Sequence, residues 1–370
     1  MKPAPTTQAL FGALSFLVFQ LALTCPAFAQ AWLPPKGSMD VGFSYQYVFA
    51  LDHISSAPFG DPNAGKKLGS PVYSQTMAVD LDLGLSDKMA VTFTVPYVTS
   101  KFPGGIDIGH RRARRTLALT NRQDDGTYNG TVQDLRFGVR YSLPMRRLAI
   151  TPFVEGIVPS HHYETNAHAA IGRDLRGVTA GVNVGRFFGP YVYFQTRYSY
   201  TAAESVVGIR PNRSRVEGEF GYFLTDRVAL RAAVTFLATH YDEDSPAAKA
   251  WVANVTQRAD LDLLVRNSVH HDRIMKERHL HLGGGLSYAL GRSWAIHASA
   301  LGFVWGQYGH AANAITVGIN RRFTFGGSAG QPVAATSRTD RVHDGPARDD
   351  APTARPLKSG PGAKVGTARP

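Results

Sequence analysis

The chain has 370 residues, of which 44% are hydrophobic and 18% are charged, and its formal net charge is +12. Its mean hydropathy is slightly negative, which excludes a bundle of transmembrane helices, because such bundles are far more apolar. The only cysteine, Cys25, lies so near the N-terminus that cleavage just beyond it would remove all disulfide and thiol chemistry.

The first 29 residues have the features of a secretory signal peptide. Lys2 precedes an apolar core at residues 9–23, and Ala27-Phe28-Ala29 forms an A-x-A cleavage pattern. The core is too short to span a bilayer comfortably. We therefore expect residues 1–29 to be removed on export and residues 30–38 to form an N-terminal periplasmic segment. An exported chain rarely meets nucleic acid, so the positive charge favours anionic lipid head groups, anionic solutes or solvated loops instead.

Alternating apolar and polar residues fill the region from residue 39 to residue 325. A period of two is typical of β-strands that have one apolar face. The runs occupy residues 41–49, 76–85, 91–97, 134–143, 148–158, 174–188, 191–202, 213–224, 228–239, 278–290, 294–306 and 314–325. Tilted strands of about ten residues are long enough to cross a bilayer.

Short and long connections alternate along the chain. The short ones are residues 86–88, 144–147, 189–190, 225–227 and 291–293, and the long ones are 51–72, 100–131, 159–172, 203–212, 240–277 and the shorter 307–312. Membrane barrels have short periplasmic turns and long external loops. We therefore predict an all-β fold, a transmembrane antiparallel up-and-down β-barrel of about 12 strands in the bacterial outer membrane. Residues 326–370 lack large apolar side chains and should form a disordered C-terminal tail.

Several strands resemble those of one group of bacterial barrels. Residues 134–143 (DLRFGVRYSL), 94–97 (TVPY) and 151–154 (TPFV) are similar to strands of the family named for the MetA pathway of phenol degradation. The resemblance covers residues 37–325. It implies an outer-membrane transporter, and more loosely the uptake of aromatic or apolar small molecules.

The alternation places many charged side chains on the inner face of the barrel. They form either a packed interior of salt bridges or a solute path whose charges select ions and polar groups. The residues are Asp80, Asp82, Asp134, Arg136, Arg140, Glu155, Arg197, Arg213, Arg215, Glu217, Glu219, Arg231, His279 and His281.

Other motifs support no catalytic, metal or cofactor site. His297-x-Ser299 is similar to the pair of outer-membrane phospholipases, but both side chains are expected to point into the lumen, away from lipid. His279-x-His281 lacks a third ligand at a defined spacing. The arginines of residues 111–115 could bind lipopolysaccharide phosphates, although a solvated loop is the simpler interpretation. Residues 245–267 are the one helical candidate, with Ser245 as the cap.

The last strand ends in aromatic residues. We expect Phe323 and Phe325 to act as the signal that the barrel-assembly machinery recognises. Arg321 occupies an outward position and should snorkel to the interface. The interpretation that the sequence favours is an outer-membrane channel or passive transporter for small molecules, with no cofactor. The alternatives are a lipid-modifying barrel enzyme and a structural barrel with a closed lumen.

Signal removal can be tested directly. Protein extracted from membranes should begin near Gln30, because the A-x-A pattern ends at Ala29. Mass spectrometry of the intact chain reports the first residue, and a mass that includes Met1 would contradict the expectation.

Overall fold

The computed structural model describes residues 31–54, 67–103, 125–143, 145, 147–165, 169–242, 244–250, 270–307 and 309–325. Four sequence predictions lie outside the described residues. They concern the signal peptide at 1–29, the arginine cluster at 111–115, most of the helical candidate at 245–267, and the tail at 326–370.

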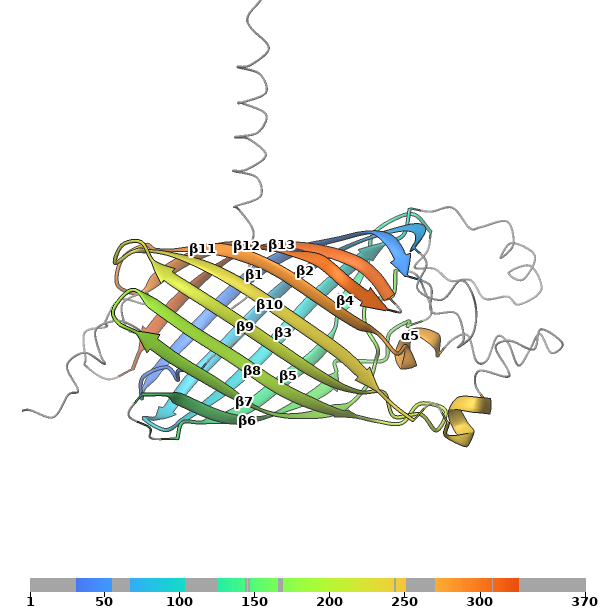
Figure 1. Ribbon diagram of the computed structural model, residues 1–370, viewed down its shortest axis with the longest axis horizontal. Helices are drawn as coiled ribbons and strands as arrows, with labels where there is room; N and C mark the ends of the chain where they lie inside the picture. The colour runs from blue at the N-terminus through green and yellow to red at the C-terminus, as the bar shows by residue number, and fades with distance from the viewer. Residues whose placement is uncertain are drawn as a thin grey trace, which may run out of the picture.

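Twelve long antiparallel strands close into a barrel, and one short strand is added at its rim (Figure 1). Each long strand pairs with its neighbour in the chain, and β1 pairs with β13 to complete the ring. The long strands are β1 (Ser38–Ile54), β2 (Lys67–Ser86), β3 (Met89–Lys101), β5 (Asp134–Tyr141), β6 (Ala149–Pro159), β7 (Gly177–Phe188), β8 (Val192–Ala203), β9 (Asn212–Phe223), β10 (Val228–His240), β11 (Arg278–Ala289), β12 (Trp294–Gln307) and β13 (Gly309–Thr324). The predicted fold class is confirmed.

Short turns gather at one end of the barrel, and the longer connections lie at the other (Figure 1). Gly189 and Gly291 stand in two of the short turns with φ angles of 67° and 116°. A side chain would be strained in this backbone conformation, so glycine suits both turns. We call the two ends the turn end and the loop end.

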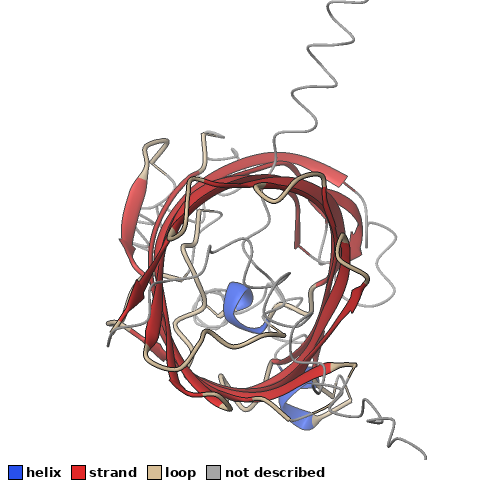
Figure 2. Ribbon diagram, turned by 90° about the vertical axis from the view of Figure 1, so that its left-hand side faces the viewer, coloured by secondary structure: helices blue, strands red, loops and turns tan. Residues whose placement is uncertain are grey.

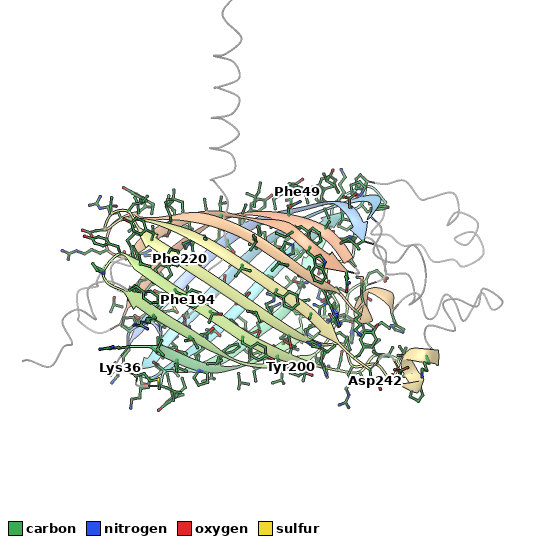
Figure 3. The ribbon with its side chains drawn as sticks, in the orientation of Figure 1. Lys36, Phe49, Phe194, Tyr200, Phe220 and Asp242 are labelled. Atoms are coloured by element: carbon green, nitrogen blue, oxygen red, sulfur yellow. The ribbon has the colours of Figure 1, made fainter. Side chains whose placement is uncertain are left out.

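The outer wall of the barrel is apolar (Figure 3). On β5, Phe137 and Val139 are 51% and 45% exposed, whereas Arg140, the residue after Val139, is 4% exposed. Phe194 and Phe220 continue this exposed surface on β8 and β9. A closed ring leaves no backbone edge unpaired, and an apolar wall is the surface that lipid solvates. The strands therefore form a membrane-spanning barrel.

Several strands differ from their predicted limits at the loop end. β1 continues to Ile54, and β2 begins at Lys67. The pairing register shifts after Ala50. Beyond this shift the two strands occupy much of the predicted loop at residues 51–72. β4 (Asn129–Val132) pairs with β3 inside the predicted loop at residues 100–131. Strand pairs that extend beyond the bilayer need no alternation, which is why the sequence pattern missed them.

Strand β7 begins later than predicted. The alternation predicts a strand over residues 174–188, but β7 starts at Gly177. Asp174 has a φ of 48°, which breaks an extended chain, and Leu175 is buried in an apolar cluster at the loop end. Residues 174–176 keep the alternating pattern of the strand, but they pack against a loop and do not join the sheet.

The described residues at the loop end include two helical segments. Residues 246–250 are helical, and Ser245 caps them because its Oγ accepts a hydrogen bond from the backbone N–H of Ala248 at 3.2 Å. This start agrees with the sequence prediction. The second helix is α5 (His271–Ile274). Neither of these described helices is long and apolar enough to cross a membrane.

Arg321 contacts two aromatic rings on the outer wall of the barrel. Its guanidinium lies over the ring of Phe323 at 4.4 Å and over the ring of Trp294 at 4.9 Å, measured to the centroids. Aromatic faces attract cations, so a charge on the outer wall is accommodated by two neighbouring rings. Phe325 follows with its side chain 57% exposed and its backbone N–H donating to the Gly37 carbonyl at 2.7 Å.

The terminal aromatic and this arginine give a matched test of membrane insertion. Phe325→Ala should reduce the membrane yield much more than Arg321→Leu, because it removes an exposed interfacial aromatic at the end of the last strand. Arg321→Leu forfeits cation–π contacts of about 0.5–1 kcal/mol each but keeps an apolar outer wall. Folded protein in membranes, quantified by gel migration without heating, is the measurement. Equal yields would place the insertion signal elsewhere.

Candidate functional site

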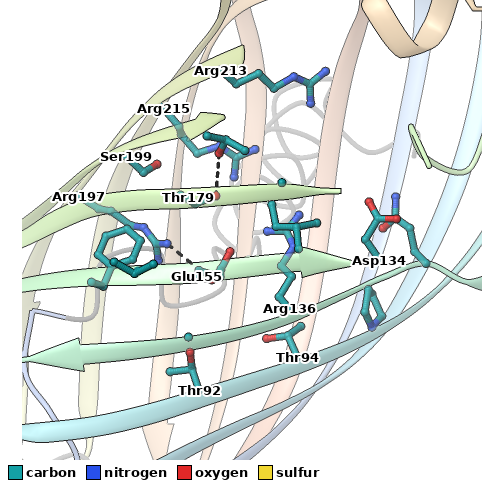
Figure 4. A pocket seen from close by; sticks show the side chains of 18 of the residues that line it. Thr92, Thr94, Asp134, Arg136, Glu155, Thr179, Arg197, Ser199, Arg213 and Arg215 are labelled. Carbon is teal, nitrogen blue, oxygen red and sulfur yellow. Dashed lines mark hydrogen bonds and ion pairs between the residues drawn. The ribbon is translucent and has the colours of Figure 1, made fainter. Parts of the chain in front are cut away.

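A polar cavity of about 510 Å³ lies inside the barrel (Figure 4). Side chains on the inner face of β2, β3 and β5 to β9 form its wall, together with the segment before β7. Seven arginines and five carboxylates contribute to this wall, so its formal charge is positive. They are Arg136, Arg140, Arg173, Arg176, Arg197, Arg213, Arg215, Asp80, Asp82, Asp134, Glu155 and Glu217.

The structure brings together ten of the fourteen charged or imidazole side chains that the sequence assigned to the lumen. These ten line the cavity, whereas Glu219, Arg231, His279 and His281 do not. Glu219 and Arg231 are nevertheless buried, with side-chain exposures of 1% and 8%. The Nε2–H of His281 donates a hydrogen bond to the carbonyl oxygen of Ala312 at 2.9 Å.

Ion pairs hold the walls together on the side of the cavity toward the turn end. Arg322 forms a bidentate ion pair with Asp40, in which Nε and Nη2 each donate to a carboxylate oxygen at 2.7 Å. Arg140 pairs with Asp82 across the lumen face of β5 and β2. Buried charges are tolerated when they are paired and hydrogen-bonded in this way.

Glu219 is the centre of a buried polar group. Its Oε1 accepts hydrogen bonds from the Tyr193 hydroxyl at 2.6 Å and from the Gln195 amide at 3.0 Å. Its Oε2 lies 3.5 Å from Nη1 of Arg231. Three strands, β8, β9 and β10, are thereby tied at one point of the inner wall.

The segment before β1 lies inside this end of the barrel. The backbone N–H of Ala31 donates to Oε1 of Gln195 at 3.3 Å, and the Ala31 carbonyl accepts from Thr151 at 2.7 Å. The ring of Trp32 lies 4.7 Å from that of Phe187, centroid to centroid. The sequence indicated only a periplasmic segment here, because a stretch this short, interrupted by Pro34 and Pro35, carries no periodic signal. The segment narrows the lumen at the turn end.

The middle of the cavity holds arginines whose charge is only partly compensated (Figure 4). Arg197 lies 3.9 Å from Glu155 and 3.8 Å from Glu217, and its guanidinium covers the ring of Phe153 at 4.0 Å. Arg215 shares Glu217 at 3.4 Å. The guanidinium of Arg136 makes no hydrogen bond or close ion pair with a residue that the structure describes, although its charge acts on the carboxylates of Asp80 and Asp134.

A second constriction lies at the loop end, where two arginines clamp α5 to the segment before β7. Nε of Arg173 donates to the Arg273 carbonyl at 2.9 Å, and Nε of Arg273 donates to the Arg173 carbonyl at 3.0 Å. Ile274, 1% exposed, packs with Leu175 and Ile209. Burial, reinforced by Arg213, lowers the pKa of Arg173 to about 9, so it stays protonated at neutral pH.

α5 lies at the loop end of the barrel. Figure 1 shows it beyond the ends of the strands, and in the view along the barrel a helix at the same height lies within the outline of the ring (Figure 2). The sequence could not predict the clamp, because neither arginine lies in a strand and loops have no period. We call the contact between Arg173 and Arg273, with Ile274, the arginine clamp.

The loop after β6 is held to the same wall. The Tyr163 hydroxyl donates to Asp134 at 2.6 Å and accepts from the backbone N–H of Asp174 at 2.9 Å. Burial and the Asp134 carboxylate raise the pKa of Tyr163, so it remains a neutral donor. His162 lies 3.1 Å from Asp174. These contacts place loop residues over the rim without forming a metal site.

The histidine motifs do not assemble into reactive sites among the described residues. The rings of His279 and His281 meet edge to face at 4.8 Å, and no group of three metal-binding side chains accompanies them. Ser299 is fully buried on the lumen side of β12, and its hydroxyl has no hydrogen bond to His297. A nucleophile needs such a bond to its base.

No family model matches the chain, and no curated protein matches it significantly. Solved barrels are similar to it. The COG4313 outer membrane channel from Pseudomonas putida F1 superposes with a TM-score of 0.56 at 11% identity, over 81% of this chain and 100% of that one. The fold is that of an outer-membrane channel. The NanC porin (TM-score 0.41, 12% identity, 76% and 98% covered) and the CymD monoaromatic hydrocarbon channel (0.39, 10%, 80% and 90%) are less similar.

The Glu219 group provides a stability test with a matched control. Glu219→Ala leaves Arg231 buried without its carboxylate, which should cost about 3–5 kcal/mol. Glu155→Ala should cost far less, because Arg197 keeps Glu217. The temperature at which each variant loses its folded gel migration is the measurement. Similar temperatures for the two variants would mean that the Glu219 group adds little stability.

Proposed function

We propose that this protein is a passive channel for small molecules in the bacterial outer membrane. The observation that carries the proposal is a polar cavity of about 510 Å³ inside a closed barrel whose outer wall is apolar. An aqueous cavity in such a wall offers polar solutes a route that lipid denies them. Outer-membrane lipids, including lipopolysaccharide, and the barrel-assembly machinery are the expected partners.

The proposal extends to the family of the protein and to the class of its solutes. We infer membership of the barrel family named for the MetA pathway of phenol degradation from the strands at residues 94–97, 134–143 and 151–154. Aromatic compounds are the solutes that this resemblance favours. Phe153, which lies in the cavity wall beneath Arg197, gives such a ring an apolar surface to pack against.

The two alternatives have less support. A lipid-modifying enzyme would need a nucleophile that meets lipid, and Ser299 is buried on the lumen side without a bond to His297. A structural barrel would need no cavity, and packed side chains would fill its interior. Liposome swelling with purified protein tests the channel directly. Swelling in small neutral solutes no faster than in protein-free liposomes would overturn it.

The arginine clamp should limit passage through the channel. Arg273→Ala removes the donors to the carbonyls of Arg173 and Asp174, so α5 is released from the wall. We expect a larger single-channel conductance in planar bilayers, by about twofold or more, because a constriction in series sets the resistance.

Arg186→Ala is the matched control for the clamp. Arg186 is an exposed arginine on the outer wall, stacked on Phe188, and does not line the cavity. Its removal should leave conductance unchanged. An unaltered conductance in Arg273→Ala would show that α5 does not narrow the path.

A further inference from the structure

We propose that the cavity is an anion-selective constriction that binds small organic carboxylates as they pass, an inference that rests on the proposed channel function. Its recognition elements are the guanidinium groups of Arg136, Arg197 and Arg215, which come from three different strands and face one space (Figure 4). Arginine presents a planar fork of donors that matches a carboxylate.

The carboxylates of the wall are already engaged. Asp82 pairs with Arg140, Asp134 accepts from Tyr163, and Asp80 accepts from Thr94 at 2.7 Å. Glu155 and Glu217 face Arg197. Each acidic group therefore has a partner within the wall, and positive charge is what remains for a solute.

The arginines are engaged less completely. The two ion pairs of Arg197 are 3.8 Å and 3.9 Å long, beyond normal hydrogen-bond distance, so its N–H donors stay available. Arg215 shares one carboxylate with Arg197 and is 40% exposed. Arg136 makes no ion pair with a described residue. A carboxylate placed between these groups would satisfy donors that the protein leaves open.

The surroundings suit an organic anion rather than a bare ion. Ser199 and the hydrogen-bonded hydroxyls of Thr179 and Thr201, 2.8 Å apart, line the wall beside the arginines and add neutral polar groups. Phe153 supplies an apolar face under Arg197. A volume of about 510 Å³ admits a single-ring carboxylate with water. Low-dielectric walls strengthen the attraction of the excess charge for an anion.

Ion selectivity of the full chain in planar bilayers tests the proposal. The zero-current potential across a KCl gradient should show preference for chloride over potassium. Arg136→Gln and Arg215→Gln should each reduce this preference by about threefold. Arg215→Gln strands no buried carboxylate, because Glu217 keeps Arg197. Arg136→Gln leaves Asp80 its hydrogen bond from Thr94 and Asp134 its hydrogen bond from Tyr163. Arg186→Gln removes the same charge from the outer wall and should leave the preference unchanged.

Benzoate and benzamide distinguish carboxylate binding from a general anion preference. They have nearly the same shape, and only benzoate is charged. Benzoate should block the chloride current in the wild-type channel at concentrations where benzamide does not, and Arg136→Gln should weaken the block.

Each outcome of these experiments decides between stated alternatives. A conducting channel without chloride preference, with equal block by both compounds, or with an equal loss in Arg186→Gln overturns the anion site and leaves the channel standing. A folded protein that does not conduct at all overturns the channel, and the inference with it.

Discussion

The pairing of β1 with β13 is the constraint on which the rest of the structure depends. Lipid offers no partner to a backbone N–H or carbonyl, so a strand edge left open in the membrane would be costly. The register that joins Ser38 to Thr324 removes that edge and turns a sheet into an enclosed wall. The outer face must then be apolar, and every charge that the strands carry has to point inward or find an aromatic surface, as Arg321 does on Trp294 and Phe323.

The enclosed charges divide the interior into two kinds of region. Toward the turn end, carboxylates and arginines meet at hydrogen-bond distance, and the Glu219 group ties three strands together. In the middle, the ion pairs are longer, and Arg136 forms no close ion pair with a described residue. Close pairing gives the wall its stability, whereas incomplete pairing leaves donors that a solute can use. The same residue types therefore serve different purposes according to how far apart they are held.

The sequence predicted the barrel well because its signal is periodic. Alternation at residues 134–143 put Phe137 outside and Arg140 inside, and the structure has both as expected. Parts of the chain without a period could not be predicted. The contacts of Ala31 and Trp32 with the inner wall, the short strand β4 and the reciprocal contacts of Arg173 and Arg273 depend on how non-repeating segments fold back over a finished ring. Alternation also misplaced the start of β7, since residues 174–176 keep the pattern but leave the sheet at Asp174.

The acceptors in the arginine clamp are main-chain carbonyls of Arg173, Asp174 and Arg273. A carbonyl does not take up a proton in mild acid, and a guanidinium does not lose one there. The hydrogen bonds that join Arg173 and Arg273 therefore form without any carboxylate, unlike the ion pairs of the barrel wall. No side-chain substitution can remove a main-chain carbonyl. The clamp can be weakened only through its two arginines or through a change in the backbone position of the segments that it joins.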